Sequence, residues 1–290
     1  MKTERGGERV VTVWCSVREN RNGEMGKESG KVKRKAGGEV TAEIDSGTNK
    51  KVKTGDKKER GVTESRKFVL NGFGEKINEV EPKRDARGNL IFKDFPKFRP
   101  SLTPKQVIQA GSFGGCYFHP RGGKPGIINP KKGVDINHKE FPVHWFEGLR
   151  QDQYAGRRYK TKEINKYGVK AGQPQAEWER MGWIHQQDPR GWFHWYCRFY
   201  LGRRSDDDNR QVSRWIGVCG AKGRWKQRIA NMCAVKAIAK REKKKAGTEV
   251  GDGNGHDDES ISPVIRQTLL HWAYILTERD VSDAMKKMYG

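Results

Sequence analysis

The sequence predicts a mostly helical fold: a single helical domain with irregular glycine- and proline-rich loops, preceded by a disordered basic tail. Three observations favour this fold class. The first 66 residues are rich in Gly, Lys, Glu, Thr and Ser, and too few of them are apolar to offset the entropy lost on ordering. In the rest of the chain, apolar segments repeatedly begin at a capping residue or proline and end at glycine. The aromatic run at 192–201 contains no Val, Ile or Thr, which disfavours a buried strand.

Changes in composition predict three regions and a linker. Residues 1–66 form the basic tail, 67–100 an extended strap, and 101–290 an aromatic-rich basic helical domain. An acidic, glycine-rich linker at 246–260 precedes the C-terminal helix of that domain. The tail contains two basic clusters, typical of a bipartite nuclear-import signal or a phosphate-binding arm, at 31–35 and 50–53.

The strap and the start of the domain carry aromatic residues and turn signals. Phe92, Phe95 and Phe98 stand among prolines, which predicts that their rings pack onto the domain. Thr103 is an expected N-cap, and the helix that follows it meets a stop at Gly111. The glycine-rich loop at 111–118 lacks the ending of a P-loop, so a structural turn is favoured over a phosphate cradle. Short helices are predicted over 142–149, 162–167 and 175–181.

The segment 182–202 is compatible with two structures. As a helix, Asp188 would cap it, Pro189 would begin it and Gly202 would end it. As a strand after a turn at 188–191, it would belong to a hairpin over 183–201 and make the fold α+β. We favour the helix because the run is long for a strand and has no β-branched residue.

More helices are expected towards the C-terminus. The first has Ser205 as its N-cap, and the acidic residues of its first turn complement the helix dipole. A long basic helix spans 224–245, with an apolar side made of Ile229, Met232, Val235 and Ile238. Finally, an amphipathic helix starts at Ser262-Pro263, and its apolar residues recur at helical spacing as far as Leu276.

The charge of the chain indicates a polyanionic partner. Its 59 Lys and Arg outnumber its 36 Asp and Glu, which gives a formal net charge of +23. Such an excess makes a compact state repel itself unless a polyanion screens the charge. Nucleic acid is the commonest polyanion, and each neutralised phosphate releases counterions. The sequence therefore predicts a DNA- or RNA-binding protein, and a merely soluble basic protein is the bland alternative.

Arginines, aromatic rings and a basic helix supply the candidate binding residues. The planar fork of arginine donates two parallel hydrogen bonds to phosphate, and aromatic rings stack on bases. The candidates are Trp192, Tyr196, Arg198, Arg203, Arg204, Arg210, Arg214, Arg224, Lys226 and Arg228. Two structural alternatives stay open: the arginines form a salt-bridge lattice with nearby aspartates, or the aromatic residues form the core.

The preferred hypothesis, nucleic-acid binding, requires no catalytic residue, metal ligand or cofactor, and we expect none. Catalysis is the second functional hypothesis. A metal-dependent enzyme acting on nucleic acid would use Asp206, Asp207 or Asp208 to hold Mg²⁺, but adjacent aspartates in one turn point in different directions. The five cysteines form no C-x-x-C pair, so structural zinc is not expected. The third hypothesis is a structural protein that binds a protein partner.

Compartment signals favour an intracellular protein. The cysteine count is odd, and the N-terminal residues lack the apolar core of a signal peptide. The basic clusters predict a nuclear location, with the cytoplasm as the alternative. No stretch approaches the roughly 18 apolar residues of a membrane span, so no membrane partner is expected.

Several short motifs together resemble a family of proteins found in fungi, algae and other eukaryotic microbes. They are FGGCYF at 113–118, NKYGVK at 165–170, GWI at 182–184, DPRGWF at 188–193, and the arginine- and aspartate-rich stretch 202–215. The resemblance covers roughly residues 95–280 and leaves out the tail. It implies a eukaryotic origin, and because no activity is established for that family, it implies nothing about mechanism.

Overall fold

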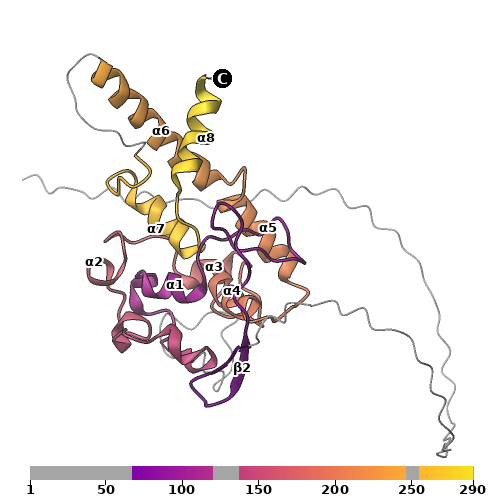
Figure 1. Cartoon of the computed structure of the whole chain (residues 1–290). Helices are drawn as coiled ribbons and strands as arrows, with labels where there is room; N and C mark the ends of the chain where they lie inside the picture. The colour runs from indigo at the N-terminus through magenta and orange to yellow at the C-terminus, as the bar shows by residue number, and fades with distance from the viewer. Residues whose placement is uncertain (1–66, 120–136, 246–254, 290) are drawn as a thin grey trace, which may run out of the picture. The chain divides into compact units, whose positions relative to one another are not determined.

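Helices form most of the regular structure in the described part of the chain, as the sequence predicts (Figure 1). The predicted basic tail at 1–66 and most of the predicted linker at 246–260 lie outside the described residues. Everything described belongs to the second of the two units into which the chain divides, which begins at Ser65. The computed structural model describes residues 67–119, 137–245 and 255–289.

A two-stranded sheet precedes a series of helices. The strands are β1 (Lys67–Leu70) and β2 (Lys76–Glu79). The α-helices are α1 (Pro104–Gln109), α2 (Thr161–Ile164), α3 (Gln175–Arg180), α4 (Trp192–Tyr200), α5 (Asp208–Cys219), α6 (Arg224–Lys245), α7 (Pro263–His271) and α8 (Glu278–Tyr289). The short 3₁₀ helices are η1 (Phe113–Gly115), η2 (His138–Glu140), η3 (Val143–Trp145) and η4 (Gln151–Gln153). Within the described residues, no helix is both long enough and apolar enough to cross a membrane.

The sequence predicts an extended strap over 67–100, but the first part of this segment forms a β-hairpin. β1 and β2 pair antiparallel, with Val69 opposite Ile77. The turn between them closes because the side-chain oxygen of Asn71 accepts the backbone N–H groups of Phe73 and Glu75. These hydrogen bonds replace the backbone partners that an extended chain would leave to water.

Phe98 lies at the centre of the hydrophobic core. Phe98 belongs to the segment before α1, and its side chain is fully buried against the helices α4 and α5. Its centroid lies 5.2–6.4 Å from those of the neighbouring rings, most of which meet it edge to face. These neighbours are Phe92, Trp192, Trp195, Tyr196, Phe199 and Trp215.

The aromatic run is a helix, α4, and the alternative hairpin over 183–201 is excluded. The helix begins at Trp192 rather than at Pro189, with Gly191 as its N-cap at φ +80°. Asp188 was expected to cap this helix, and that prediction is wrong. Its fully buried carboxylate accepts hydrogen bonds from Arg198 and Arg203 instead, because a buried charge needs cationic partners more than a helix terminus needs a cap.

Capping signals located the first helix well and later ones less well. Thr103 caps α1 with a complete capping box that includes Gln106. Ser205 does not cap α5 with its side chain; its hydroxyl and backbone N–H both donate to Asp208, the first helical residue. The predicted helix at 162–167 stops at Ile164, because the backbone N–H of Tyr167 donates to the α7 residue Gln267.

The basic helix α6 has the predicted bounds but buries a different face. Met232 and Val235 are 41% and 59% exposed, so the predicted apolar side is wrong. Ile229, Met232 and Val235 are spaced three apart, and three residues advance about 300° around a helix, so such a row drifts off one face by about 60° per step. The buried face consists of Ile229, Ala230, Cys233, Ala234 and Ala237.

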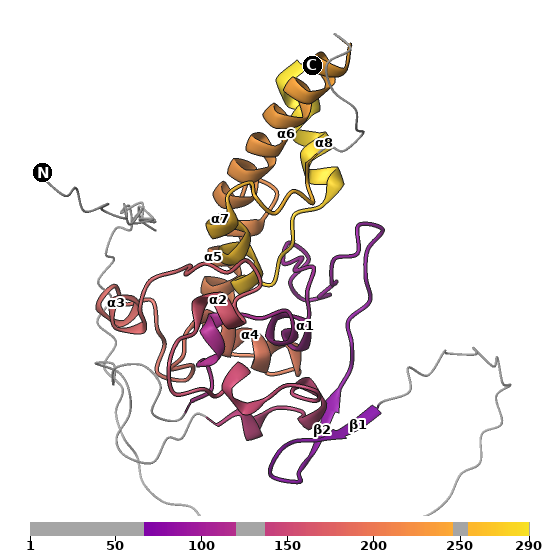
Figure 2. The ribbon, with the colours of Figure 1, turned by 90° about the vertical axis from the view of Figure 1, so that its left-hand side faces the viewer.

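The C-terminal amphipathic segment is two helices rather than one. α7 ends at His271, and Ala273 leaves the helix at φ +54°. This turn is held by the residues just before α1, since the carbonyl of Ala273 accepts the backbone N–H groups of Ser101 and Leu102. α8, which the sequence did not reveal, then packs along α6, and both helices extend away from the other helices (Figure 2).

A neutral histidine holds α7 against the glycine-rich loop. His271 Nε2 accepts the backbone N–H of Phe113 at 3.0 Å, and the two rings stack at 4.1 Å. Burial lowers the pKa of His271 to about 3. Protonation of Nε2 would remove the acceptor for Phe113, so the folded state requires the neutral ring.

We predict that acid weakens the fold through His271. The unfolded chain protonates this histidine near pH 6.5, whereas the folded state does so only near pH 3. The unfolded state therefore binds more protons between these two pH values. As the pH is lowered through this range, the free energy of unfolding decreases by up to about 1.4 kcal/mol per pH unit. Urea unfolding of the full chain from pH 7.5 to 4.5 measures this slope.

The variant His271→Gln should have a shallower slope below pH 6.5 than the wild type. Equal slopes for His271→Gln and the wild type would refute the role given to His271.

Candidate nucleic-acid interface

The arginines around α4 lie in an internal ion-pair network. Arg203 donates to both oxygens of Asp188, at 2.7 and 2.6 Å. Arg198 donates to the same carboxylate at 3.1 Å and to both oxygens of Glu140. Although burial raises the pKa of Glu140, hydrogen bonds from His194 and Arg198 lower it to about 2. Arg198 therefore joins η2 to the loop before α4, and its fork is occupied by protein carboxylates.

Arg204 makes an ion pair closer to the surface. It donates to Asp94 at 2.5 Å, and its guanidinium lies 3.9 Å from the ring centroid of Phe199. Its side chain is 38% exposed. Arg204 therefore ties the strap to the end of α4.

The pair Arg210 and Arg214 fixes the loop before α4. Both donate to the backbone carbonyl of Trp183, at 3.3 and 3.1 Å. Arg210 also forms a two-point ion pair with Asp207, and the guanidinium of Arg214 lies 5.6 Å from the ring of Trp183. Burial raises the pKa of Asp207, but hydrogen bonds from Arg210 and Gln211 lower it below its usual value. This arrangement is the predicted salt-bridge lattice, extended by a tertiary contact.

Trp192 and Tyr196 belong to the core, so their prediction as base-stacking residues is wrong. They are 6% and 0% exposed, and their rings stack on each other at 5.1 Å. Their polar atoms are also satisfied internally: Trp192 Nε1 donates to Gln211 and the Tyr196 hydroxyl to Leu102. A nucleotide base has no access to either ring.

The aspartates of the second hypothesis do not converge. Asp206 is exposed, and Asp207 pairs with Arg210. Asp208 accepts the indole N–H of Trp195 at 2.7 Å and the hydroxyl of Ser205. Among the described residues, no group of three or more His, Cys, Asp or Glu side chains is placed to hold a metal ion.

The three candidates on α6 occupy different environments. Arg224 and Arg228 are exposed, and the guanidinium of Arg224 lies 5.2 Å from the ring of Trp225. Lys226 is only 12% exposed and pairs with Asp280 on α8 at 3.5 Å. Lys226 is therefore a packing residue. Among the α6 side chains that the structure describes, the exposed basic ones are Arg224, Arg228, Lys236, Arg241 and Lys243.

A second basic surface was missed by the sequence interpretation. It covers residues 157–170, around α2, and is named the basic strip here. In this strip only Glu163 opposes the basic residues Arg157, Arg158, Lys160, Lys162, Lys166 and Lys170. Arg157, Arg158, Lys162, Lys166 and Lys170 are exposed. The signal was present in the sequence as a local excess of positive charge, but the helix predicted over 162–167 covers only part of it.

The basic strip and α6 flank the same short acidic segment, Asp258 and Glu259 before α7, named the acidic loop here. Asp258 pairs with Lys236 of α6 at 2.7 Å, and Glu259 lies 3.9 Å from Lys166 of the basic strip. A hydrogen bond from Lys236 is the main cause that lowers the pKa of Asp258 to about 2. α2, α7 and α6 follow one another on the face turned to the viewer in Figure 2. We take α6 and the basic strip together as the candidate interface.

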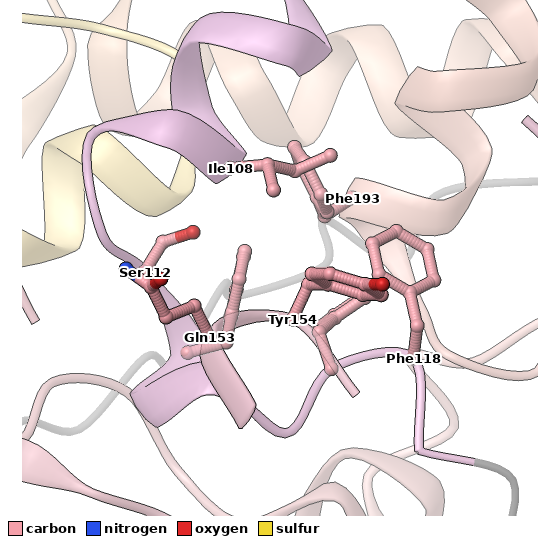
Figure 3. Close-up of a pocket in the computed structure, with 8 residues that line it drawn as sticks. Ile108, Ser112, Phe118, Gln153, Tyr154 and Phe193 are labelled. Atoms are coloured by element: carbon pink, nitrogen blue, oxygen red, sulfur yellow. The ribbon is translucent and has the colours of Figure 1, made fainter. Parts of the chain in front are cut away.

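Two hollows lie in other places of the described chain. The one drawn in Figure 3 has a volume of about 10 Å³ among packed side chains that include Phe118, Tyr154 and Phe193, enough for a single water. A larger hollow of about 260 Å³ lies between the hairpin turn at Gly72 and the η2–η3 segment. The His138 ring in that hollow packs against Phe146 and Tyr154.

Comparisons of the chain with protein-family models, curated proteins and solved structures find no match.

We predict that the double variant Arg210→Lys/Arg214→Lys loses stability and keeps its affinity for nucleic acid. Lysine retains the charge but cannot hold Asp207 and the Trp183 carbonyl at once. The melting temperature should fall by about 2–8 °C, which corresponds to about 1–2 kcal/mol for a domain of this size. Thermal unfolding and oligonucleotide titration on the same protein measure both properties.

The matched control is Arg157→Lys/Arg158→Lys, an exposed pair without ion pairs in the described residues, which should melt with the wild type. A clear loss of affinity in Arg210→Lys/Arg214→Lys would return this pair to the binding surface.

Proposed function

We propose that this protein binds nucleic acid, DNA or RNA, through the exposed basic residues of α6 and the basic strip. The observation that carries the proposal is an imbalance of charge on this surface. α6 contains nine basic residues and one acidic residue, Glu242, so it contributes +8 of the net charge of +23. The arginines of α4 and α5 already have carboxylate or carbonyl partners inside the fold, whereas this surface has a surplus.

The surplus persists after local ion pairs are counted. Within the described residues, the exposed Arg228 and Arg241 and the half-buried Lys240 on α6 have no carboxylate partner, and Arg157, Arg158 and Lys162 in the basic strip have none either. Concentrated like charges repel one another, and a polyanion relieves this repulsion. Release of counterions from the polyanion then favours binding.

The dimensions of α6 suit a nucleic-acid backbone. A helix of 22 residues is about 33 Å long, comparable with the axial length of about ten base pairs of B-DNA. Phosphate contacts of this kind give affinity and orientation but read no bases. The basic clusters of the tail support a nuclear location for the same function, although they lie outside the described residues.

A salt titration tests the proposal. The full chain should bind labelled 20-nucleotide DNA or RNA at 50 mM salt, and the logarithm of its affinity should fall linearly with the logarithm of salt concentration. The triple variant Arg228→Gln/Lys240→Gln/Arg241→Gln should reduce the slope by about 0.7–0.9 for each phosphate that it no longer neutralises.

The control triple Lys76→Gln/Lys93→Gln/Lys97→Gln removes the same charge from the exposed hairpin and strap. It should change affinity much less than the α6 variant. No binding by the wild type at low salt, or equal decreases in affinity for the two triple variants, would overturn the proposal.

The acidic loop should weaken binding, because it competes for two basic residues of the interface. We predict that Asp258→Asn/Glu259→Gln binds the same oligonucleotide several-fold more tightly at low salt, since Lys236 and Lys166 lose their carboxylate partners. Asparagine keeps the oxygen that accepts from Ser260, so the loop should retain its turn. Fluorescence anisotropy measures the change.

The double variant Glu147→Gln/Asp206→Asn makes the same change in net charge at exposed positions away from the acidic loop. If it tightens binding as much as Asp258→Asn/Glu259→Gln, only net charge matters and the acidic loop has no local role.

A further inference from the structure

Tyr159 is an exposed aromatic ring inside the basic strip. Where side chains are described, the exposed aromatic residues are Tyr159, 38% exposed, and Phe73, 60% exposed. Most of the other tryptophans, tyrosines and phenylalanines with described side chains are buried in the core, and the rest of these are half-buried. Phe73 lies in the hairpin turn, where no comparable concentration of positive charge surrounds it. Tyr159 is therefore the exposed ring that the fold places among cations.

The ring of Tyr159 is held in place by the segments beneath it. Gly114 packs so closely against one side that a Cβ there would lie 2.4 Å from the ring. The hydroxyl accepts a hydrogen bond from the side-chain amide of Asn165 at 3.0 Å. Asn165 is itself 4% exposed, and it also accepts the N–H of Gly114 and donates to the carbonyl of Val169. The orientation of the ring is thus fixed before any ligand arrives.

One basic residue lies near the ring in space and others lie beside Tyr159 in the sequence. The ammonium of Lys170 lies 6.0 Å from the ring centroid, at the edge of cation–π range. Arg157 and Arg158 precede the tyrosine directly and are exposed, and Lys162 and Lys166 follow on α2 and beyond it. An aromatic platform flanked by cations is the arrangement that proteins use to bind a base and its neighbouring phosphates.

We infer that Tyr159 is a stacking platform for a base of single-stranded nucleic acid, with the arginines and lysines of the basic strip holding the adjacent phosphates. This inference rests on the proposed nucleic-acid binding and names its substrate class. Bases of a duplex are already stacked on their neighbours and present only their edges. A fixed exposed ring adds affinity only for a strand whose bases are free to stack, whereas the phosphate contacts of α6 serve both kinds of strand.

The test compares three probes with the full chain: a 20-nucleotide thymidine oligonucleotide, an abasic oligonucleotide of the same length, and a 20-base-pair duplex. Tyr159→Ala should lower affinity for the thymidine oligonucleotide by about 5- to 150-fold, the range expected when one base no longer stacks. Its affinities for the abasic oligonucleotide and the duplex should stay within twofold of the wild type. Tyr159→Phe keeps the ring and should bind like the wild type.

Two controls keep the outcome clear. Phe73→Ala removes the other exposed ring and should change none of the three affinities. If Tyr159→Ala melts well below the wild type, Arg157→Gln/Arg158→Gln replaces it: this variant leaves the ring in place and should lower the salt slope for the thymidine oligonucleotide.

The outcomes separate the inference from the proposed function. Equal loss of affinity for the thymidine and abasic oligonucleotides, or unchanged thymidine binding in Tyr159→Ala, overturns the stacking role while nucleic-acid binding stands. A wild-type chain that binds none of the three probes at low salt overturns both.

Discussion

The burial of Phe98 among the rings of α4 and α5 is the interaction on which the rest of the fold depends. It brings the segment before α1 across two helices that are distant in sequence, and its neighbours include Trp195 and Trp215, both almost fully buried. Aromatic contacts of this kind supply much of the buried apolar area in a chain with a modest apolar content. Because the core needs these rings, α4 has no aromatic face left for a ligand.

The same constraint determines which arginines are available. Closing α4 over the core buries Asp188 completely, and a buried carboxylate is tolerated only with cationic partners. Arg198 and Arg203 fill that role, and Arg210 and Arg214 fix the loop at Trp183. The cluster of arginines at 198–214 therefore serves internal ion pairs and hydrogen bonds. The positive charge that remains for a polyanion lies on α6 and in the basic strip, where carboxylates are few.

The sequence predicted features that depend on neighbouring residues and missed those that depend on distant ones. The cap at Thr103 and the bounds of α6 follow from local composition, and so does the helical state of the aromatic run. The end of α7 is set by backbone hydrogen bonds from Ser101 and Leu102, and the exposed face of α6 is set by packing against α8. Neither contact leaves a local pattern in the sequence. The candidate site divides in the same way: Arg224 and Arg228 stay on the surface, whereas Lys226 pairs with Asp280. The charge of the basic strip can be read from the sequence, but the exposure of Tyr159 within it depends on the fold.

Lysine footprinting tests most directly whether the surplus charge on α6 and the basic strip forms the binding surface. The full chain is acetylated at low reagent concentration, alone and with a saturating single-stranded oligonucleotide, and each lysine is quantified by mass spectrometry. The account predicts that the oligonucleotide lowers the reactivity of the interface lysines Lys162, Lys166, Lys170, Lys236 and Lys240. Lys76 and Lys93, exposed on the hairpin and strap, should react as before. Protection confined to the hairpin and strap, or no protection at a concentration where binding is measured, would contradict it.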